Sequence, residues 1–270
     1  MNEEIVDILT RNGFEGFYAM LLYTVLRPLG FLFGFLPISW GVGQAVLLRM
    51  SIALALGLPM FVVNAPGVEE IIQATLPLLS ALAAVKEFGV GYGIGFLASL
   101  PFFALQYAGA ITDSFRGESD GGQTDPTGGT LQTFSVLYLV IGFSVFFSMG
   151  GLWDLVGLLY ATYGVWPVSG ALPAFTMEAG LVMVDLLQIT LVTAIQISIP
   201  LLALLVTIEI AISVAARLAR KFGFYDMAFP IKNTAAILTL PIVAWFVSSF
   251  SETSVVDLSI LQNMFEAIIE

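Results

Sequence analysis

The chain contains no cysteine and no histidine among its 270 residues. Without cysteine it can form no disulfide, no thiolate nucleophile and no iron–sulfur site. Without histidine it cannot carry a zincin motif, a His-based catalytic triad, a histidine haem ligand or an imidazole pH switch. These absences disfavour an enzyme, and we expect no cofactor and no metal ion.

Charged residues are also scarce, at 11% of the chain, whereas 58% of its residues are hydrophobic. An average soluble domain has about 25% charged and about 45–50% apolar residues. A soluble protein of this length could not hide so much apolar side chain beneath a polar surface. The composition therefore predicts an integral membrane protein. The net charge of −11 disfavours nucleic-acid binding through a basic surface.

The hydrophobic residues gather in runs of helical length. The runs are Phe17–Pro37, Val42–Val63, Ile71–Val85, Phe88–Ile111, Leu131–Met149, Leu152–Val168, Leu181–Ala216 and Thr234–Phe250. They predict seven or eight apolar helices, and so an all-α polytopic membrane protein. Two stretches, Asn64–Glu70 and Pro167–Pro173, have the proline and glycine content typical of turns.

The run Leu181–Ala216 is longer than a bilayer requires, since the hydrocarbon core needs about 20 helical residues. Either this run is one long helix that leaves the membrane, or it is two pieces joined at Pro200, which would kink it.

The two ends of the chain differ from the apolar runs. Residues 1–16 are polar and lack the basic start of a signal peptide, so we expect no cleavage there. In residues 251–270, apolar side chains recur at helical spacing opposite an acidic face, which predicts an amphipathic helix. An acidic face is poorly matched to an anionic lipid surface, so a partner helix or the protein's own bundle is the favoured contact.

Two hydrophilic loops separate apolar runs. The loop 113–130 is rich in glycine and acids but does not fit the ligand spacing of a calcium loop, so it is a solvated connector or a functional loop. The segment Arg217–Lys232 is rich in basic residues, and the positive-inside rule places it in the cytoplasm. The runs on either side of this segment then form a hairpin with a basic tip.

The stretch Val90-Gly91-Tyr92-Gly93 resembles part of a potassium-channel filter. A filter needs a re-entrant loop behind a pore helix, and here the apolar run continues without one. Helix packing is the alternative, because Gly91 and Gly95 form a small-xxx-small pair, as do Gly89 and Gly93.

Charges inside apolar runs are costly, and by default they mark function. They are Arg27, Arg49, Asp154, Asp185 and Glu209. Glu209, Ser213 and Arg217 share one helix face and could form a ladder toward the cytoplasmic end. Interhelical pairing that fixes assembly and a proton or ion relay are both open for these residues.

Several motifs together resemble the T component of the type III secretion export apparatus, whose flagellar counterpart is the R component (the SctT/FliR family). The motifs, spread over about residues 17 to 250, are Arg27-Pro28, Leu36-Pro37, Gly109–Gly117 (GAITDSFRG), Thr162-Tyr163, Trp166-Pro167, Pro200, Glu209, Arg217, Pro230 and Lys232. The G-x-x-x-D-x-x-R-G form of the third motif is more similar to the injectisome branch, which serves virulence or symbiosis, than to the flagellar branch.

The resemblance implies a single-copy structural subunit of an export gate, built as an inner-membrane helical protein with kinked helical hairpins. One copy would join about five R-type and about four S-type subunits in a pore through which unfolded secreted proteins cross the bacterial inner membrane. Part of that assembly would lie at the periplasmic side. A U-type switch protein, a V-type export protein and membrane lipid are the other partners that the resemblance implies.

The resemblance also implies a division of the chain and a set of candidate residues. The polar segment 1–16 is followed by an R-like part 17–180, an S-like hairpin 181–250 with its basic tip at 217–232, and the amphipathic helix 251–270. The candidate assembly or pore residues are Arg27, Pro28, Asp113, Arg116, Gly117, Tyr163, Pro167, Pro200, Glu209, Arg217 and Lys232.

Two other functions compete with the export gate. A secondary transporter for a small solute would show an inverted repeat and a midplane site, and the two halves of this chain show no convincing repeat. An intramembrane enzyme with an aspartyl pair such as Asp154 and Asp185 is formally possible, but nothing around these residues resembles a catalytic motif.

Overall fold

The computed structural model describes residues 2–43, 45–73, 77–117, 123–124, 130–170, 177–218 and 227–250. The predicted amphipathic helix 251–270 lies outside these residues. Most of the 113–130 loop and residues 219–226 of the basic tip lie outside them as well.

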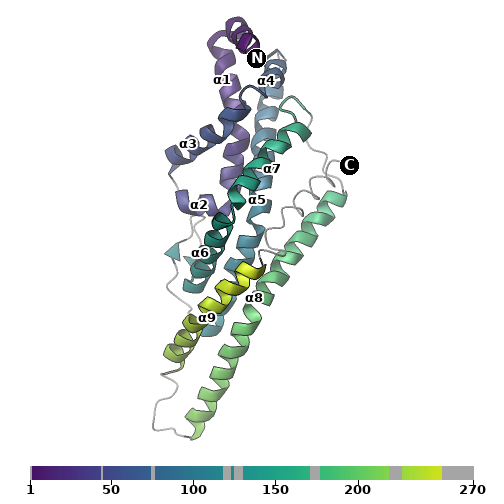
Figure 1. The fold of residues 1–270 in the computed structure, drawn as a ribbon. Helices are drawn as coiled ribbons and strands as arrows, with labels where there is room; N and C mark the ends of the chain where they lie inside the picture. The colour runs from purple at the N-terminus through teal and green to yellow at the C-terminus, as the bar shows by residue number, and fades with distance from the viewer. Residues whose placement is uncertain are drawn as a thin grey trace. The chain divides into compact units, whose positions relative to one another are not determined.

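Helices account for almost all of the described chain (Figure 1), as the composition predicts. They are α1 (Asn2–Gly34), α2 (Leu36–Val42), α3 (Val46–Gly57), the short 3-10 helix η1 (Leu58–Met60), α4 (Ala65–Gln73), α5 (Pro77–Arg116), α6 (Thr133–Ser148), α7 (Gly151–Val165), α8 (Met177–Leu218) and α9 (Ala228–Phe250). Two-residue strands β1 (Gln123–Thr124) and β2 (Thr130–Leu131) pair antiparallel in the polar loop.

Four of the described helices are long and apolar enough to cross a membrane. The number rises to six if each of two bent helix pairs forms one span. One pair is α3 with α4, which is bent by 103°, and the other is α6 with α7. The all-α membrane architecture expected from the sequence is confirmed.

The chain divides into two compact units. Unit 1 contains the described residues of 1–99 and 152–182, and unit 2 contains those of 100–151 and 183–257. Two of the boundaries, 99/100 and 182/183, fall inside the long helices α5 and α8, so each of these helices contributes to both units.

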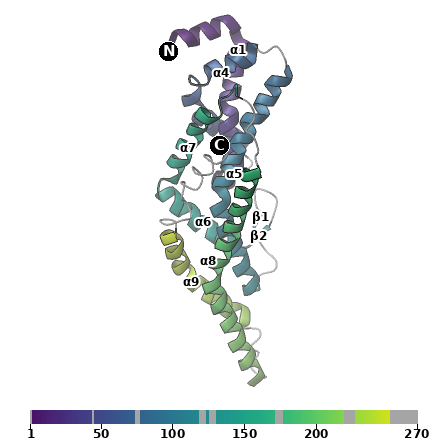
Figure 2. The same ribbon diagram turned by 90° about the vertical axis from the view of Figure 1, so that its right-hand side faces the viewer.

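In unit 1, α1 and α5 lie side by side (Figures 1 and 2) and meet through glycines. A Cβ built on Gly91 would lie 1.9 Å from the Arg27 carbonyl oxygen, and one built on Gly95 would lie 2.3 Å from that of Phe31. These distances leave no room for any side chain, so the backbones touch. Helix packing by the Gly91–Gly95 pair is thus confirmed.

The other pair of glycines on α5 has a different environment. A Cβ at Gly89 or Gly93 would meet nothing within 4 Å. Moreover, α5 is one continuous helix through this stretch, so there is no re-entrant loop here. The filter interpretation of Val90-Gly91-Tyr92-Gly93 is therefore wrong.

A buried serine joins the ends of α1 and α2. Phe35 is extended between the two helices, with φ −84° and ψ 106°, so the helical hydrogen bonding is interrupted there. The Ser99 hydroxyl accepts the Leu36 N–H at 2.7 Å and lies 3.0 Å from the Gly34 carbonyl oxygen. This contact satisfies backbone groups that the break would otherwise leave unpaired.

Two predicted helix boundaries are wrong, and the structure gives the reasons. The segment Asn64–Glu70 is not a turn, because α4 begins at Ala65 with Pro66 as its second residue, where a missing N–H costs nothing. The predicted break between Val85 and Phe88 does not exist either, because α5 continues through two charged residues that are buried and paired.

In unit 2, the end of α5 packs with α6, α8 and α9. The buried core is formed by Leu105, Ala108, Phe134, Tyr138, Ile197, Leu201, Leu205, Ala236 and Val243. Helix α8 runs through Pro200 without a break, so the long apolar run is one helix of 42 residues. At about 1.5 Å per residue, it measures about 60 Å, twice the thickness of a hydrocarbon core of about 30 Å.

Candidate functional site

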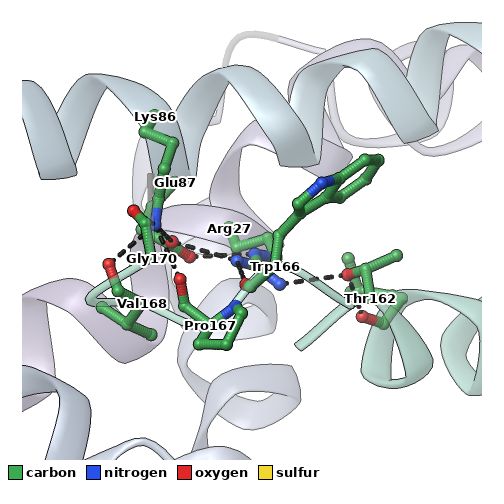
Figure 3. A network of polar contacts seen from close by, with 9 residues as sticks. Arg27, Lys86, Glu87, Thr162, Trp166, Pro167, Val168 and Gly170 are labelled. Atoms are coloured by element: carbon green, nitrogen blue, oxygen red, sulfur yellow. Dashed lines mark hydrogen bonds and ion pairs between the residues drawn. The ribbon is translucent and has the colours of Figure 1, made fainter. Parts of the chain in front are cut away.

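Apart from Arg217, the charged residues of the predicted set fall into two clusters, one in each unit. The Arg27 cluster consists of Arg27, Lys86, Glu87, Thr162 and the turn 166–170 in unit 1 (Figure 3). The Asp113 cluster consists of Asp113, Arg116, Glu209, Lys232 and Asn233 in unit 2.

Arg27 is fully buried on α1 and binds two other helices. Its Nε donates to Glu87 Oε2 at 2.8 Å and its Nη2 to Glu87 Oε1 at 2.9 Å, which is the bidentate geometry of a strong ion pair. Nη1 donates to the Thr162 hydroxyl at 3.1 Å, and Nη2 also donates to the Trp166 carbonyl at 2.7 Å. The guanidinium carbon lies 3.9 Å from the centre of the Tyr163 ring.

Lys86 extends the same network toward the turn after α7 (Figure 3). Its Nζ donates to the carbonyl oxygens of Pro167 and Val168, both at 2.7 Å, and to that of Gly170 at 3.0 Å. It also lies 3.3 Å from Glu87 Oε1. Two cations thus share one carboxylate, and main-chain carbonyls and the Thr162 hydroxyl accept their other hydrogen bonds.

The Arg27 cluster can stabilise the packing of α1, α5 and α7 only when all of its members are present. A buried charge is tolerated when it is paired and its hydrogen bonds are made. Removing one member of a buried pair typically costs about 3–5 kcal/mol, because the other charge stays buried without its partner. The Arg27 cluster therefore makes the arrangement of these helices specific.

In unit 2, Asp113 caps the N-terminus of α6, although Asp113 itself lies on α5. Its Oδ2 accepts the backbone N–H groups of Phe134 at 2.9 Å and Ser135 at 3.2 Å, both in the first turn of α6. The cap position of α6 itself, Gln132, makes no side-chain cap hydrogen bond. Asp113 therefore supplies the carboxylate that a local cap residue normally provides.

Arg116 joins this cap to α9. Its Nη2 donates to Asp113 Oδ1 at 2.7 Å, and its Nη1 donates to Asn233 Oδ1. The guanidinium carbon also lies 4.7 Å from the centre of the Phe134 ring. Arg116 is buried, so its position fixes the end of α5 against the starts of α6 and α9.

Lys232 completes the Asp113 cluster. Its Nζ donates to Glu209 Oε2 at 2.6 Å, which links α9 to α8, and lies 3.3 Å from the Phe115 carbonyl oxygen. The Glu209 side chain is 59% exposed, whereas Lys232 is buried. Because water screens the carboxylate, we expect this ion pair to contribute less than the Arg27–Glu87 pair.

Known proteins that are similar to this chain belong to the family that its motifs indicate. The family model described as "Bacterial export proteins, family 1" matches residues 18–257. The chain belongs to this family. The resemblance to export-apparatus components is thereby confirmed.

The similar proteins include components of several secretion systems. The Yop proteins translocation protein T of Yersinia pestis is 33% identical over 240 residues, which cover 83% of this chain and 85% of that protein. The flagellar biosynthetic protein FliR of Pectobacterium carotovorum is 26% identical over 188 residues, covering 66% and 69% of the two chains. The secretion system apparatus protein SsaT of Salmonella typhimurium is 25% identical over 229 residues, covering 75% and 86%.

In this export protein, the structure gives each residue of the G-x-x-x-D-x-x-R-G motif a physical role. A Cβ on Gly109 would lie 2.4 Å from Ser135 Cα, so only glycine lets α5 and α6 approach so closely. Asp113 and Arg116 form the buried pair that caps α6. Gly117 ends α5 with φ at +91°, a conformation that favours glycine, and donates its N–H to the Asp113 carbonyl at 3.1 Å.

Pro28 and Pro200 lie within long helices. Because proline has no N–H, Pro28 leaves the Thr24 carbonyl without its helical partner. The same carbonyl oxygen would lie 2.8 Å from a Cβ on Gly57, so α3 approaches α1 at this point. Pro200 is exposed on α8, although Ser198 and Leu201 close to it are buried.

The predicted site residues do not form a single site. Arg27, Tyr163 and Pro167 meet in unit 1, whereas Asp113, Arg116 and Lys232 meet in unit 2. Interhelical pairing is confirmed for Arg27 and Glu209. Arg217 is exposed in the last turn of α8. A role of these residues in assembly or in a pore stays a prediction.

Lys86 and Glu87 were missed by sequence reasoning as site residues. They separate two predicted apolar runs and are the sole charged residues between positions 77 and 112. The signal that could have found Glu87 is its charge, which is opposite to that of Arg27 on another apolar run. Their pairing depends on which helices meet, which one sequence does not specify.

Proposed function

We propose that this chain is a single-copy, non-enzymatic structural subunit of a type III secretion export gate. With R-type and S-type subunits it would form a protein-conducting pore for unfolded substrates across the bacterial inner membrane. The observation that carries the proposal is the family match over residues 18–257.

The named relatives support the type of system. The Yersinia relative is called a Yop proteins translocation protein and the Salmonella relative a secretion system apparatus protein. The Yersinia protein is 33% identical, against 26% for the flagellar relative from Pectobacterium. These values favour an injectisome over a flagellar role for this chain.

The exposed apolar surface supports membership of a larger assembly. Helix α8 is about 60 Å long, and a bilayer core covers about 30 Å of it. Its apolar side chains are nevertheless exposed near both ends, with Leu181 at 57% and Val214 at 51%. Lipid cannot cover both ends of such a helix, so other subunits are the natural contact.

The resemblance suggests how the subunit is arranged with its partners. Residues 17–180 would correspond to an R-type subunit and residues 181–250 to an S-type hairpin, with about five R-type and four S-type chains around one copy of this chain. The basic segment 217–232 would face the cytoplasm and meet the U-type switch protein and the V-type export protein. Part of the assembly would lie at the periplasmic side.

Native mass spectrometry in mild detergent tests this proposal. The tagged chain is expressed alone and again with candidate R-type and S-type subunits from the same genome. A discrete hetero-complex with one copy of this chain is the expected result. A stable monomer or homodimer that does not bind these subunits would overturn the proposed export-gate function. It would favour a transporter for a small solute.

A further inference from the structure

The turn after α7 turns its carbonyl oxygens toward two buried cations. Of its five residues, Trp166 presents its carbonyl to Arg27, and Pro167, Val168 and Gly170 present theirs to Lys86 (Figure 3). Carbonyl oxygens beyond the end of a helix carry partial negative charge and have no helical donor. The two side chains supply the missing donors.

Lys86 fills an oxygen cage. A primary ammonium has three N–H donors, and three carbonyl oxygens surround its Nζ at 2.7, 2.7 and 3.0 Å. The Glu87 carboxylate approaches from the same region at 3.3 Å and balances the charge. Lys86 and its hydrogen bond to Val168 are buried, whereas its bonds to Pro167 and Gly170 are partly buried.

Hydrogen bonds within the turn contribute little to its conformation. Gly170 donates its N–H to the Pro167 carbonyl at 3.0 Å, and the same carbonyl also accepts from Lys86. The Val168 and Gly170 carbonyls both converge on Nζ although Ser169 lies between them. Without a cation, these oxygens would repel one another in a buried space.

We propose that the turn 167–170 is a monovalent-cation cage whose resident cation is the Lys86 ammonium. This tethered cation holds the turn closed and so fixes where α7 ends. The inference does not depend on the export function.

The size of the cage selects a class of cation. Oxygen distances of 2.7–3.0 Å exceed the about 2.0–2.1 Å of magnesium and the about 2.3–2.6 Å of calcium. Carbonyl oxygens that replace a hydration shell are the ligands of potassium in channel filters. Potassium and ammonium ions are therefore the free cations that should replace a missing Lys86 side chain.

Spin labelling of the full-length protein tests the cage. Because the chain has no cysteine, Ser169→Cys would be its sole thiol, and a nitroxide on it reports the mobility of the turn. Lys86→Met removes the charge but keeps the apolar stem, whereas Lys86→Ala also leaves space for an ion. Val85→Met, at the exposed neighbouring position, is the matched control.

We expect Lys86→Met and Lys86→Ala to shorten the rotational correlation time of the label at least about twofold. Val85→Met should leave it unchanged. Potassium or ammonium chloride should restore order in the Lys86→Ala protein, and choline chloride at the same ionic strength should not.

Three results would overturn the proposal. One is a Lys86→Met protein with wild-type mobility at the turn. Another is a Lys86→Ala protein in which potassium, ammonium and choline have the same effect. The third is an equal loss of order at a label on Ser144→Cys in unit 2, since that would mean general unfolding.

Discussion

At the scale of single residues, the buried charges of this protein are neutralised by groups far away in the sequence. Arg27 finds its carboxylate at Glu87 and its hydroxyl partner at Thr162. Asp113 finds its backbone donors at Phe134 and Ser135. Each of these side chains joins two helices. Hydrophobic contacts are not directional, so they alone would not fix the relative position of these helices.

Replacing Arg27 by Met should lower the free energy of unfolding by about 3–5 kcal/mol, because the Glu87 carboxylate loses its bidentate partner while it stays buried. The double variant Arg27→Met/Glu87→Met should recover only part of this loss, since the uncompensated carboxylate is gone but Lys86 loses its counter-charge. Unfolding in mixed detergent, followed by tryptophan fluorescence, measures the difference. If the losses of Arg27→Met and of Glu87→Met measured singly simply add up in the double variant, the pair is not coupled.

Asp113→Ala should be more harmful than Asp113→Asn. The alanine variant loses the cap of α6, worth about 0.5–2 kcal/mol, and also leaves Arg116 buried without its carboxylate. The asparagine variant keeps an oxygen that can accept the Phe134 N–H. Asp185→Asn, at an exposed position of α8, is the control and should change stability by less than about 0.5 kcal/mol. Thermal unfolding that ranks the two Asp113 variants in the opposite order would contradict the capping role.

At the scale of the helices, close backbone contacts and side-chain hydrogen bonds at helix ends determine how the helices pack. The contact of α1 with α5 depends on Gly91 and Gly95, and the break after α1 depends on the Ser99 hydroxyl. Helix α5 keeps its course through Lys86 and Glu87 because both charges are satisfied inside unit 1. The elements are therefore placed by a few small or polar residues within a very apolar chain.

Two glycines on α5 give a matched pair for testing this contact. Gly91→Ala places a methyl group where the Arg27 carbonyl oxygen now lies, so α1 and α5 must separate and the Arg27–Glu87 pair must stretch. Gly89→Ala meets nothing within 4 Å and should stabilise the helix by up to about 1 kcal/mol in the chain expressed alone. Thermal unfolding of the two variants in detergent should therefore move in opposite directions. Similar shifts for both would mean that α1 and α5 do not touch here.

At the scale of the whole molecule, the length of α8 is the feature that requires partners. Val184 and Val214 stand 30 positions apart on this continuous helix and are both exposed. At about 1.5 Å per residue they are about 45 Å apart, which exceeds a hydrocarbon core of about 30 Å at the usual helix tilts. They cannot both lie in lipid.

This length gives a prediction for single cysteines, which the cysteine-free chain permits. In membranes that contain the chain alone, a water-soluble maleimide should label Val184→Cys or Val214→Cys. In the proposed assembly, both positions should be protected, because neighbouring subunits cover what lipid cannot. Labelling that stays the same when partner subunits are co-expressed would argue against an assembly that surrounds α8.

The amino-acid sequence by itself determined the class of protein and most of its helices. Hydropathy is a sum over neighbouring residues, so runs such as Thr234–Phe250 predicted α9, and the composition predicted the membrane. The family motifs were also readable, because their order and spacing are properties of the chain. Local turn signals were less reliable, since Pro66 starts a helix rather than a turn.

Only the tertiary structure decided which polar groups meet. The sequence offers Arg27 several possible acids and cannot show that Glu87 is its partner, because the pairing depends on how α1 crosses α5. It also cannot show that Asp113 caps a helix that begins 20 residues later. Burial makes these contacts strong, since a charge removed from water must find its partner inside the protein, and burial is a property of the packed helices rather than of any one segment.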